Sequence, residues 1–268
     1  ETKRLSPIVY HSFVEVFSFN SSRADEVLRE GVRVAELYKK SGLLASIVPH
    51  APYSVSQQLF KGIDQQQSAF PGSVSMHNQE TPSENEMFVS ASGELVELFK
   101  KFGEDFSDFN PDFKSSLDYS FKQLPIGQNA ILVHNTLSTK EEIDWVNSQR
   151  NDVYFCTCPS ANLYIEDQLP NLPMWLEPAS KACVGTDSLA SNHQLSILEE
   201  LKLIQLHHPE IELESLLKMA TITGAQALNL NTGLGSFEKG KAPGVVLING
   251  ADLQNQKLGS DSFITRII

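Results

Sequence analysis

Six short apolar runs, separated by segments with helical periodicity, limit the folds that this chain can adopt. We expect β-strands at residues 10–17, 44–50, 73–79, 130–135, 151–158 and 182–187. Most of these runs are apolar almost throughout, which is typical of parallel strands that are covered on both faces. The alternating order of strand and helix predicts an α/β protein with a parallel sheet or barrel.

The helices between the strands carry recognisable start and stop signals. Capping-box patterns predict helix starts at Ser22, Ser138 and Ser191. The first of these helices is expected to end with two lysines at 39–40 and a left-handed Gly42, because cations and glycine suit a helix C-terminus.

The length and the tail of the chain predict two parts. A chain of 268 residues can form one α/β barrel domain. We expect a TIM-type (β/α) barrel over residues 1–230, incomplete because about six of the eight strands of such a barrel are recognisable. Two strands at the N-terminal side are then absent, as in a truncated form of a longer protein. Glycine-rich turns and a β-run at 245–248 predict a C-terminal β segment over residues 231–268.

Residues 103–129 interrupt the strand–helix order with many aromatic side chains and little helical pattern. Two interpretations of this segment stay open. It is either an insertion at the barrel mouth that shapes a substrate pocket, or a packed surface loop.

Composition excludes several classes of partner. The net charge of −12 argues against a nucleic acid polymer or an anionic membrane. No apolar run approaches the roughly 18 residues of a membrane helix. The odd number of cysteines, Cys156, Cys158 and Cys183, fits buried free thiols in a reducing cytoplasm.

Four of the expected strands end in side chains that can bind a metal or transfer a proton. These side chains are His50, His77, His134 and Asp187, and Glu80 follows three residues after His77. Parallel barrel strands present their C-terminal ends around one mouth, so we expect the five side chains to converge there. A metal held at this mouth would lower the pKa of bound water toward about 7, and a nearby carboxylate could carry the released proton.

Each of these residues also has a structural interpretation. Glu80 could be a solvated loop carboxylate, Asp187 a helix N-cap and His134 a hydrogen-bonded core histidine. His50 lies between two prolines, and a substrate contact and a structural function are about equally supported there. Their joint position at strand ends favours a shared site. The other histidines, at positions 11, 193, 207 and 208, are expected to be structural.

Several segments together resemble the amidohydrolase superfamily, in its cytosine deaminase-like and chlorohydrolase-like branch. Adenosine-type, aminofutalosine-type and guanine-type deaminases are the most similar in character. The segments that carry the resemblance are residues 49–56 (PHAPYSVS), 77–81 (HNQET), 133–134 (VH), 158–163 (CPSANL), 185–192 (GTDSLASN) and 217–228 (LKMATITGAQAL).

The resemblance implies a function for each residue of the expected site. His77 and Asp187 would be metal ligands, and Asp187 would also accept a proton from metal-bound water. Glu80 would pass this proton to the ring nitrogen and the leaving group. His134 would hydrogen-bond the attacking hydroxide.

The same resemblance implies the reaction and the substrate contacts. The reaction would be hydrolytic deamination, or dechlorination, of a purine-like, pyrimidine-like or nucleoside substrate, with zinc or iron as the cofactor. His50 and Asn162 would contact this small-molecule substrate. We also expect a homo-oligomer, because an unclosed barrel exposes strand edges.

One element of the family pattern is missing. Family members carry a His-x-His pair on the first strand, and the seven histidines of this chain contain no such pair. A catalytic zinc site needs about three protein ligands plus water. We therefore expect this chain to bind metal weakly or not at all. The alternative to an enzyme is a catalytically silent barrel fragment that serves binding or assembly, including one completed by a partner chain.

Overall fold

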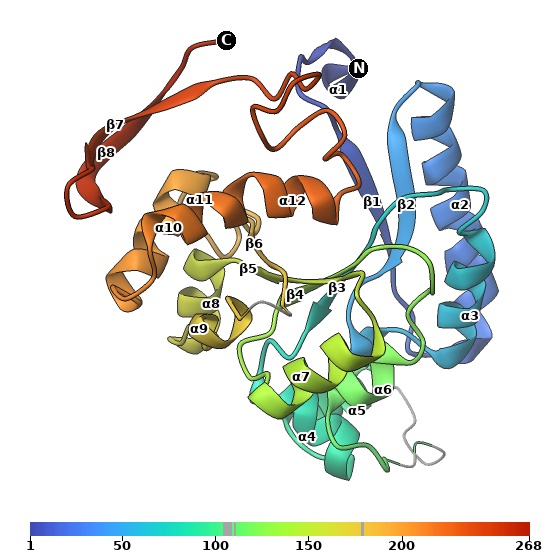
Figure 1. Cartoon of the computed structure of the whole chain (residues 1–268). Coiled ribbons are helices and arrows are strands. Elements are labelled where there is room, and N and C mark those ends of the chain that lie inside the picture. The colour runs from blue at the N-terminus through green and yellow to red at the C-terminus, as the bar shows by residue number, and fades with distance from the viewer. Residues whose placement is uncertain (104–108, 110, 178–179) are drawn as a thin grey trace. The chain divides into compact units, whose positions relative to one another are not determined.

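All six predicted strands are present in the computed structural model, which describes residues 1–103, 109, 111–177 and 180–268 (Figure 1). The chain divides into two compact units, Glu1–Val133 and His134–Ile268, called unit 1 and unit 2 below. The alternation of strands and helices confirms the α/β class. The strands are β1 (His11–Val16), β2 (Leu44–Pro49), β3 (Val74–Asn78), β4 (Ala130–His134), β5 (Val153–Thr157) and β6 (Ala182–Val184).

Unit 1 is built on the parallel pair β1–β2. The register runs from His11 opposite Leu44 to Val16 opposite Pro49. Helix α2 (Ala24–Lys40) packs against both strands, and helix α3 (Gln57–Gln66) lies beside α2 and packs against β2 (Figure 1). The approach is close at Gly31 of α2, where a Cβ atom would lie 2.6 Å from Val16 Cγ1, so a larger residue there would push the helix away from β1.

The strand ends of unit 1 are joined by backbone hydrogen bonds. The His50 N–H donates to the Val16 carbonyl at 3.3 Å, and the His77 N–H donates to the His50 carbonyl at 2.9 Å. These bonds align the C-terminal ends of β1, β2 and β3. Three helices follow in the chain: α4 (Pro82–Ser90), α5 (Glu94–Lys101) and α6 (Ser116–Phe121).

Part of the predicted insertion at 103–129 forms an aromatic cluster on α4. Tyr119 stacks on Phe88 at 4.5 Å between ring centroids, and Phe113 meets Tyr119 edge-on at 5.1 Å. Phe109 lies 5.8 Å from Phe88. Residues 104–108 and 110 of the predicted insertion lie outside the described residues. The described part is therefore held to unit 1 by packing between rings.

Unit 2 contains the parallel pair β5–β6, in which Cys156 is opposite Cys183. The helices of this unit are α7 (Lys140–Gln149), α8 (Pro159–Glu166), α9 (Leu172–Trp175), α10 (Ile197–His207), α11 (Leu213–Ala220) and α12 (Ile222–Ala227). Helices α10, α11 and α12 pack against β6, and the buried Trp175 of α9 lies 5.7 Å from the Phe155 ring.

The C-terminal strands β7 (Val246–Asp252) and β8 (Lys257–Arg266) form an antiparallel hairpin. Gln205 of α10 holds the hairpin with a double hydrogen bond to Leu258. Its side-chain amide donates to the Leu258 carbonyl at 2.9 Å and accepts from the Leu258 N–H at 3.0 Å. The domain boundary at residue 230 stays a prediction.

Helix starts were predicted less accurately than strands. A 3-10 helix over Ser21–Arg23, capped by the Asn20 side chain, precedes α2. The capping box of α7 is Thr139 with Glu142, one residue later than predicted. Helix α10 starts at Ile197 after the cap Ser196, so the predicted start at Ser191 was wrong. The predicted left-handed Gly42 after α2 is confirmed, with φ of 72°.

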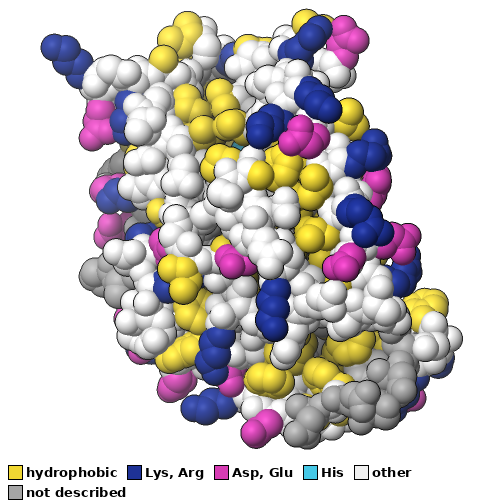
Figure 2. All heavy atoms as spheres, turned by 90° about the vertical axis from the view of Figure 1, so that its right-hand side faces the viewer, with side chains coloured by type: hydrophobic (Ala, Val, Ile, Leu, Met, Phe, Trp, Pro, Cys, Tyr) yellow, Lys and Arg dark blue, Asp and Glu magenta, His cyan; other side chains and the backbone are white. Residues whose placement is uncertain are grey.

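Charges of both signs cover the surface of unit 1 on the side of α2 and α3. Figure 2 shows Lys and Arg side chains interspersed there with Asp, Glu and hydrophobic side chains. Pairs along α2 contribute to this pattern, including Arg33 with Glu30 at 2.6 Å. Among the described residues, every helix is too short or too polar to cross a lipid bilayer.

Candidate active site

Two of the predicted site residues meet at the strand ends of unit 1. His50 directly follows β2 and His77 is the fourth residue of β3, and their ring centroids are 4.9 Å apart. Glu15 of β1 joins them, with its Oε1 atom 3.3 Å from His77 Nε2. Each of the three residues offers a ligand atom within 4.8 Å of the others.

Glu15 was missed by the sequence analysis, although a signal exists. It is a carboxylate within an otherwise largely apolar strand, an uncommon position for a charged side chain. Side chains alternate between the two faces of a strand. Val16 therefore faces α2, whereas Glu15 faces the opposite side, where the two histidines lie.

The loop after β2 orients the His50 ring. His50 Nδ1 lies 2.9 Å from Ser54 Oγ, and the Ser54 hydroxyl donates its proton to the Ala51 carbonyl at 3.1 Å. Because that proton is used, Ser54 accepts from His50 Nδ1–H, which places the lone pair of the neutral ring on Nε2. Burial lowers the pKa of His50, the neighbouring His77 lowers it further, and Glu15 opposes both effects.

A buried carboxylate holds the loop that carries Glu80. Glu84 is fully buried, and its carboxylate accepts the N–H groups of Gln79 at 2.8 Å and Glu80 at 3.2 Å. Gln79 has a left-handed φ of 46°, so these bonds stabilise an unfavourable backbone conformation. Burial raises the pKa of Glu84 to about 7. The pattern Thr81-x-x-Glu84 resembles a capping box and could have revealed Glu84 in the sequence.

Carboxylates make the environment of unit 1's strand ends negative. The pKa of Tyr53, in the loop after β2, is raised first by burial and then by the charges of Glu84, Glu80 and Glu15. This negative potential suits a bound cation.

In unit 2 the structure brings together His134 and Asp187, whose ligand atoms lie within 4.8 Å. His134 ends β4, is 1% exposed and has a left-handed φ of 75°, followed by Asn135 at 51°. Two such residues in succession cost on the order of 1–3 kcal/mol each, and such strain concentrates at functional sites. Asp187 accepts the Ser188 N–H at 2.6 Å and the Ser191 hydroxyl at 2.7 Å, so its carboxylate is fixed in orientation.

Asn162 has structural hydrogen bonds within unit 2. Its side-chain oxygen accepts the Cys158 N–H at 3.2 Å and the Thr157 hydroxyl at 3.3 Å, and its amide donates to Thr136 Oγ1 at 2.7 Å. The residue is 1% exposed. These bonds join the turn after β5 to the segment after β4, and a substrate contact by Asn162 stays a prediction.

The three cysteines lie together around the end of β6, as free thiols. A Cβ atom at Gly185 would lie 3.3 Å from Cys156 Sγ and 3.6 Å from Cys158 Sγ, so the thiols leave little room for a side chain there. Hydrogen bonding to Cys156, followed by burial, raises the pKa values of Cys158 and Cys183. Both therefore stay protonated thiols rather than nucleophilic thiolates.

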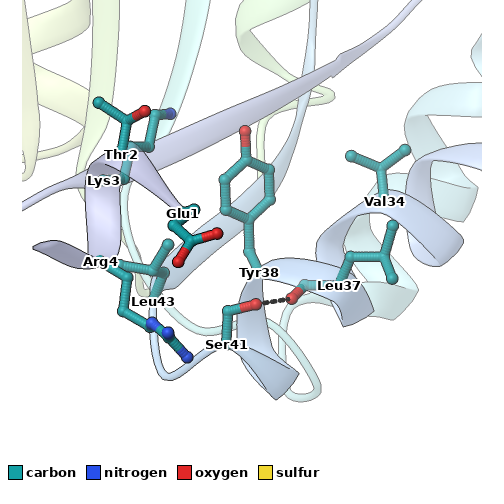
Figure 3. Close-up of a pocket in the computed structure, with 9 residues that line it drawn as sticks. All are labelled: Glu1, Thr2, Lys3, Arg4, Val34, Leu37, Tyr38, Ser41 and Leu43. Carbon is teal, nitrogen blue, oxygen red and sulfur yellow. Dashed lines mark hydrogen bonds between the residues drawn. The ribbon is translucent and has the colours of Figure 1, made fainter.

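A pocket of about 620 Å³ lies at the other end of the unit 1 strands (Figure 3). It is lined by the first residues of the chain, by the end of α2 and by Leu43, which precedes β2. Figure 3 shows the Ser41 hydroxyl donating to the Leu37 carbonyl, at 2.9 Å, along its wall. The candidate site lies at the C-terminal strand ends, so this pocket is not part of it.

Comparison with curated proteins finds relatives that are deaminases. An adenosine deaminase of Helicobacter pylori is 31% identical over 196 residues, which is 71% of this chain and 47% of the relative. A 5-methylthioadenosine/S-adenosylhomocysteine deaminase of Teredinibacter turnerae is 27% identical over 257 residues, 92% of this chain and 53% of the relative. The chain thus spans about half the length of the curated relatives it matches.

A similar solved structure and a matching family model point to the same family as these relatives. The crystal structure of Helicobacter pylori aminofutalosine deaminase in complex with methylthio-coformycin has 26% sequence identity and a TM-score of 0.78, and the match covers 91% of this chain and 59% of that one. Likeness to such structures confirms the prediction of a TIM-type (β/α) barrel that is incomplete. The model of the amidohydrolase family matches residues 10–265. Because this match extends over almost the entire sequence, the chain belongs to the amidohydrolase family.

Proposed function

We propose that this chain belongs to a metal-dependent hydrolase that deaminates a nucleoside with an adenine-like base. The observation that carries the proposal is the meeting of His50 and His77 at the strand ends of unit 1, in a chain whose relatives are named as nucleoside deaminases. We propose deamination rather than dechlorination, because both curated relatives described above are named as deaminases.

The donor atoms suit the divalent cation on which the amidohydrolase family generally depends. Imidazole nitrogens and carboxylate oxygens are the ligands that zinc and iron take in hydrolytic and related sites. Such donors lie within 4.8 Å of each other in unit 1, and so do His134 and Asp187 in unit 2. When bound, the cation would make water nucleophilic near neutral pH. His77 and Asp187 are the ligands that we propose from the family resemblance.

The chain's own residues would then bind the base and move protons. Glu80, with its backbone held by Glu84, would deliver a proton to the ring nitrogen and then to the leaving ammonia. Asp187, oriented by Ser188 and Ser191, would accept the proton released from water. His134 would donate a hydrogen bond to the attacking oxygen, and His50 would contact the substrate.

Ammonia release tests the proposal. The protein, loaded with zinc or iron in turn, is incubated with adenosine, 5-methylthioadenosine and S-adenosylhomocysteine. We expect turnover of at least one of them and a loss of about 10²–10⁴-fold in kcat for Glu80→Gln, because a positioned proton carrier contributes about that factor. Glu86→Gln, on the exposed side of the following helix, is the matched control and should retain activity.

Two results would count against the enzyme. One is the absence of ammonia from every metal-loaded sample that contains the complete protein. The other is tight binding of methylthio-coformycin without turnover of any nucleoside, which would favour the binding or assembly alternative.

Two predictions from the sequence stay proposals. We propose a homo-oligomer, which size-exclusion chromatography with light scattering would test. We also propose a reducing cytoplasmic location, with which the three free thiols agree.

A further inference from the structure

We propose that Cys156 and Cys183 form a redox-active dithiol, which hydrogen peroxide oxidises to a disulfide within unit 2. In this pair, Cys156 is the thiol that the oxidant reaches, and Cys183 is the thiol that then closes the bond. Cys158, the third cysteine of the chain, stays reduced. The inference concerns thiol chemistry alone, so it stands or falls separately from the proposed deaminase activity.

The register of β5 and β6 places the two thiols side by side. Cys156 is directly opposite Cys183 in this parallel pair. Directly opposite side chains point to the same face of a sheet, and neighbouring strands lie about 4.7–4.9 Å apart. This spacing is within the range of about 4.4–6.8 Å between the Cα atoms of disulfide-bonded cysteines. Rotation of the side chains can therefore form the bond while both strands keep their positions.

The backbone disfavours the competing bond between Cys156 and Cys158. Both Cys158 and Cys183 form a hydrogen bond with Cys156, so each is close to it. Residues two apart in an extended chain are separated by about 6.4–6.8 Å, which is the upper limit for a disulfide. Cys158 is also held in place, because its N–H donates to the Asn162 side chain at 3.2 Å. We therefore expect Cys183 to be the partner.

Burial and space assign the order in which the thiols react. Cys183 and Cys158 are each 4% exposed, whereas Cys156 is half-buried. Hydrogen bonding to Cys156, followed by burial, raises the pKa of Cys183, so that thiol is a poor direct target for an oxidant. A Cβ atom at Gly185 would lie 3.3 Å from Cys156 Sγ, and its absence leaves space beside that sulfur. Oxidation should therefore begin at Cys156.

The reaction consists of two balanced steps. The Cys156 sulfur attacks one peroxide oxygen, the O–O bond breaks, and the departing hydroxide leaves as water with the proton of the thiol. Cys156 is then a sulfenic acid. The Cys183 sulfur attacks the Cys156 sulfur, the S–O bond breaks, and a second water leaves with the proton of the Cys183 thiol. Two thiols and one hydrogen peroxide thus give one disulfide and two waters.

Peroxide treatment of the folded full-length chain tests the dithiol. We expect the thiols that react with a colorimetric thiol reagent after unfolding to fall from three to one per chain. The mass of the chain should fall by two hydrogens. Tryptic peptides separated without reductant should join the segment that contains Cys156 to the one that contains Cys183. Dithiothreitol should restore all three thiols.

Three variants distinguish the functions of the cysteines. Cys158→Ser is the matched control and should form the disulfide at the parent's rate. Cys156→Ser should lose the reaction. Cys183→Ser removes the second step, so Cys156 should accumulate as a sulfenic acid, which dimedone traps at least tenfold more than in the parent. Thermal unfolding under reducing conditions verifies that each variant is folded.

Three results would overturn the dithiol. One is a folded parent that keeps all three thiols at peroxide concentrations that oxidise the unfolded chain. Another is a disulfide that persists in Cys183→Ser and is lost in Cys158→Ser, which would assign the bond to Cys156 and Cys158. The third is a bond that joins two chains. A disulfide in a protein that releases no ammonia would support the dithiol and count against the proposed activity.

Discussion

Among the described residues, each unit has one buried glutamate whose carboxylate accepts hydrogen bonds from a loop, Glu84 in unit 1 and Glu200 in unit 2, and we call this set of bonds a brace. The two braces differ in how far along the chain the glutamate lies from the groups that it holds. In unit 1, Glu84 accepts the N–H groups of Gln79 and Glu80, only five and four residues earlier. In unit 2, Glu200 is 1% exposed and accepts the Ser160 N–H, 40 residues away, at 2.7 Å. It also accepts the Asn192 amide at 2.8 Å, in the loop after Asp187.

This difference shows which contacts keep each loop rigid. The brace in unit 1 holds a neighbouring segment, because Glu84 near the start of α4 binds the loop just before that helix, while Ser116 of α6 also hydrogen-bonds the Glu84 carboxyl group. The brace in unit 2 is tertiary, because Glu200 of α10 connects the start of α8 to the loop that follows β6. The Glu80 loop should therefore survive partial loosening of unit 1, whereas the Asp187 loop depends on the packing of unit 2.

The largest effect is expected when the tertiary brace is removed. Glu200→Ala leaves the Ser160 N–H and the Asn192 amide without their acceptor, and each lost hydrogen bond to a charged group costs about 1.5–3 kcal/mol. We expect the free energy of unfolding to fall by about 4 kcal/mol in urea denaturation. Glu199→Ala, its neighbour on α10, should cost less than about 1 kcal/mol. Equal effects of the two variants would contradict the brace.

The second prediction concerns how the stability that Glu84 contributes depends on pH. Burial raises the pKa of Glu84 to about 7 from an ordinary value near 4.5. The folded chain therefore binds more protons than the unfolded chain between these values. Stability from this group is complete below pH 4.5 and falls by about 3 kcal/mol as the pH rises to 7.

Glu84→Gln tests this pH dependence. The variant should unfold with a flatter dependence of stability on pH between 4.5 and 7, measured by urea denaturation at several pH values. Glu86→Gln, an exposed residue of the same helix, should retain the slope of the parent. An unchanged slope in Glu84→Gln would show that the buried carboxyl does not titrate in this range.

The third prediction extends the comparison to the loop after β2. Ser54→Ala removes the acceptor of His50 Nδ1–H and the donor to the Ala51 carbonyl. We expect the free energy of unfolding to fall by about 2 kcal/mol, because each of the two lost hydrogen bonds contributes about 1 kcal/mol. Urea denaturation measures the effect, with the exposed Ser90→Ala as control. Unchanged stability would mean that the strands alone hold His50 in position.

The smallest effect on stability is expected from removing a helix N-cap in unit 2. Thr139 caps α7, its hydroxyl accepting the Glu142 N–H at 3.2 Å. Thr139→Ala should cost about 1 kcal/mol in unfolding free energy, the usual value of an N-cap. Thr139→Ser retains the hydroxyl and should cost much less. A larger loss in Thr139→Ala would show that this cap also supports contacts beyond its own helix.

The success of the strand predictions has a local cause. Each strand is marked by a run of apolar residues that are consecutive in the sequence. Strands β1 to β6 all fall within their predicted ranges. Helix starts were less accurate because neighbouring residues compete for one cap. Ser138 and Thr139 both precede α7, and only the backbone geometry decides that Thr139 forms the capping box.

The candidate site was predicted in part for a related reason. Strand ends can be located from the sequence alone, and four of the candidate residues lie there: His50, His77, His134 and Asp187. Glu15 lies inside a strand, and its relation to His77 depends on the order in which β1, β2 and β3 lie side by side. Glu200 was missed because its partner Ser160 is 40 residues away and nothing in the local sequence connects them.

The amino-acid sequence by itself therefore determined the strands, their order along the chain and the donor side chains at their ends. These features follow from periodicity and from residue chemistry within a few positions. Only the tertiary structure decided that Glu15 joins His50 and His77, and that Glu200 braces the loop after Asp187. Both depend on strand register and helix packing, which bring distant residues together through many weak contacts that no short segment encodes.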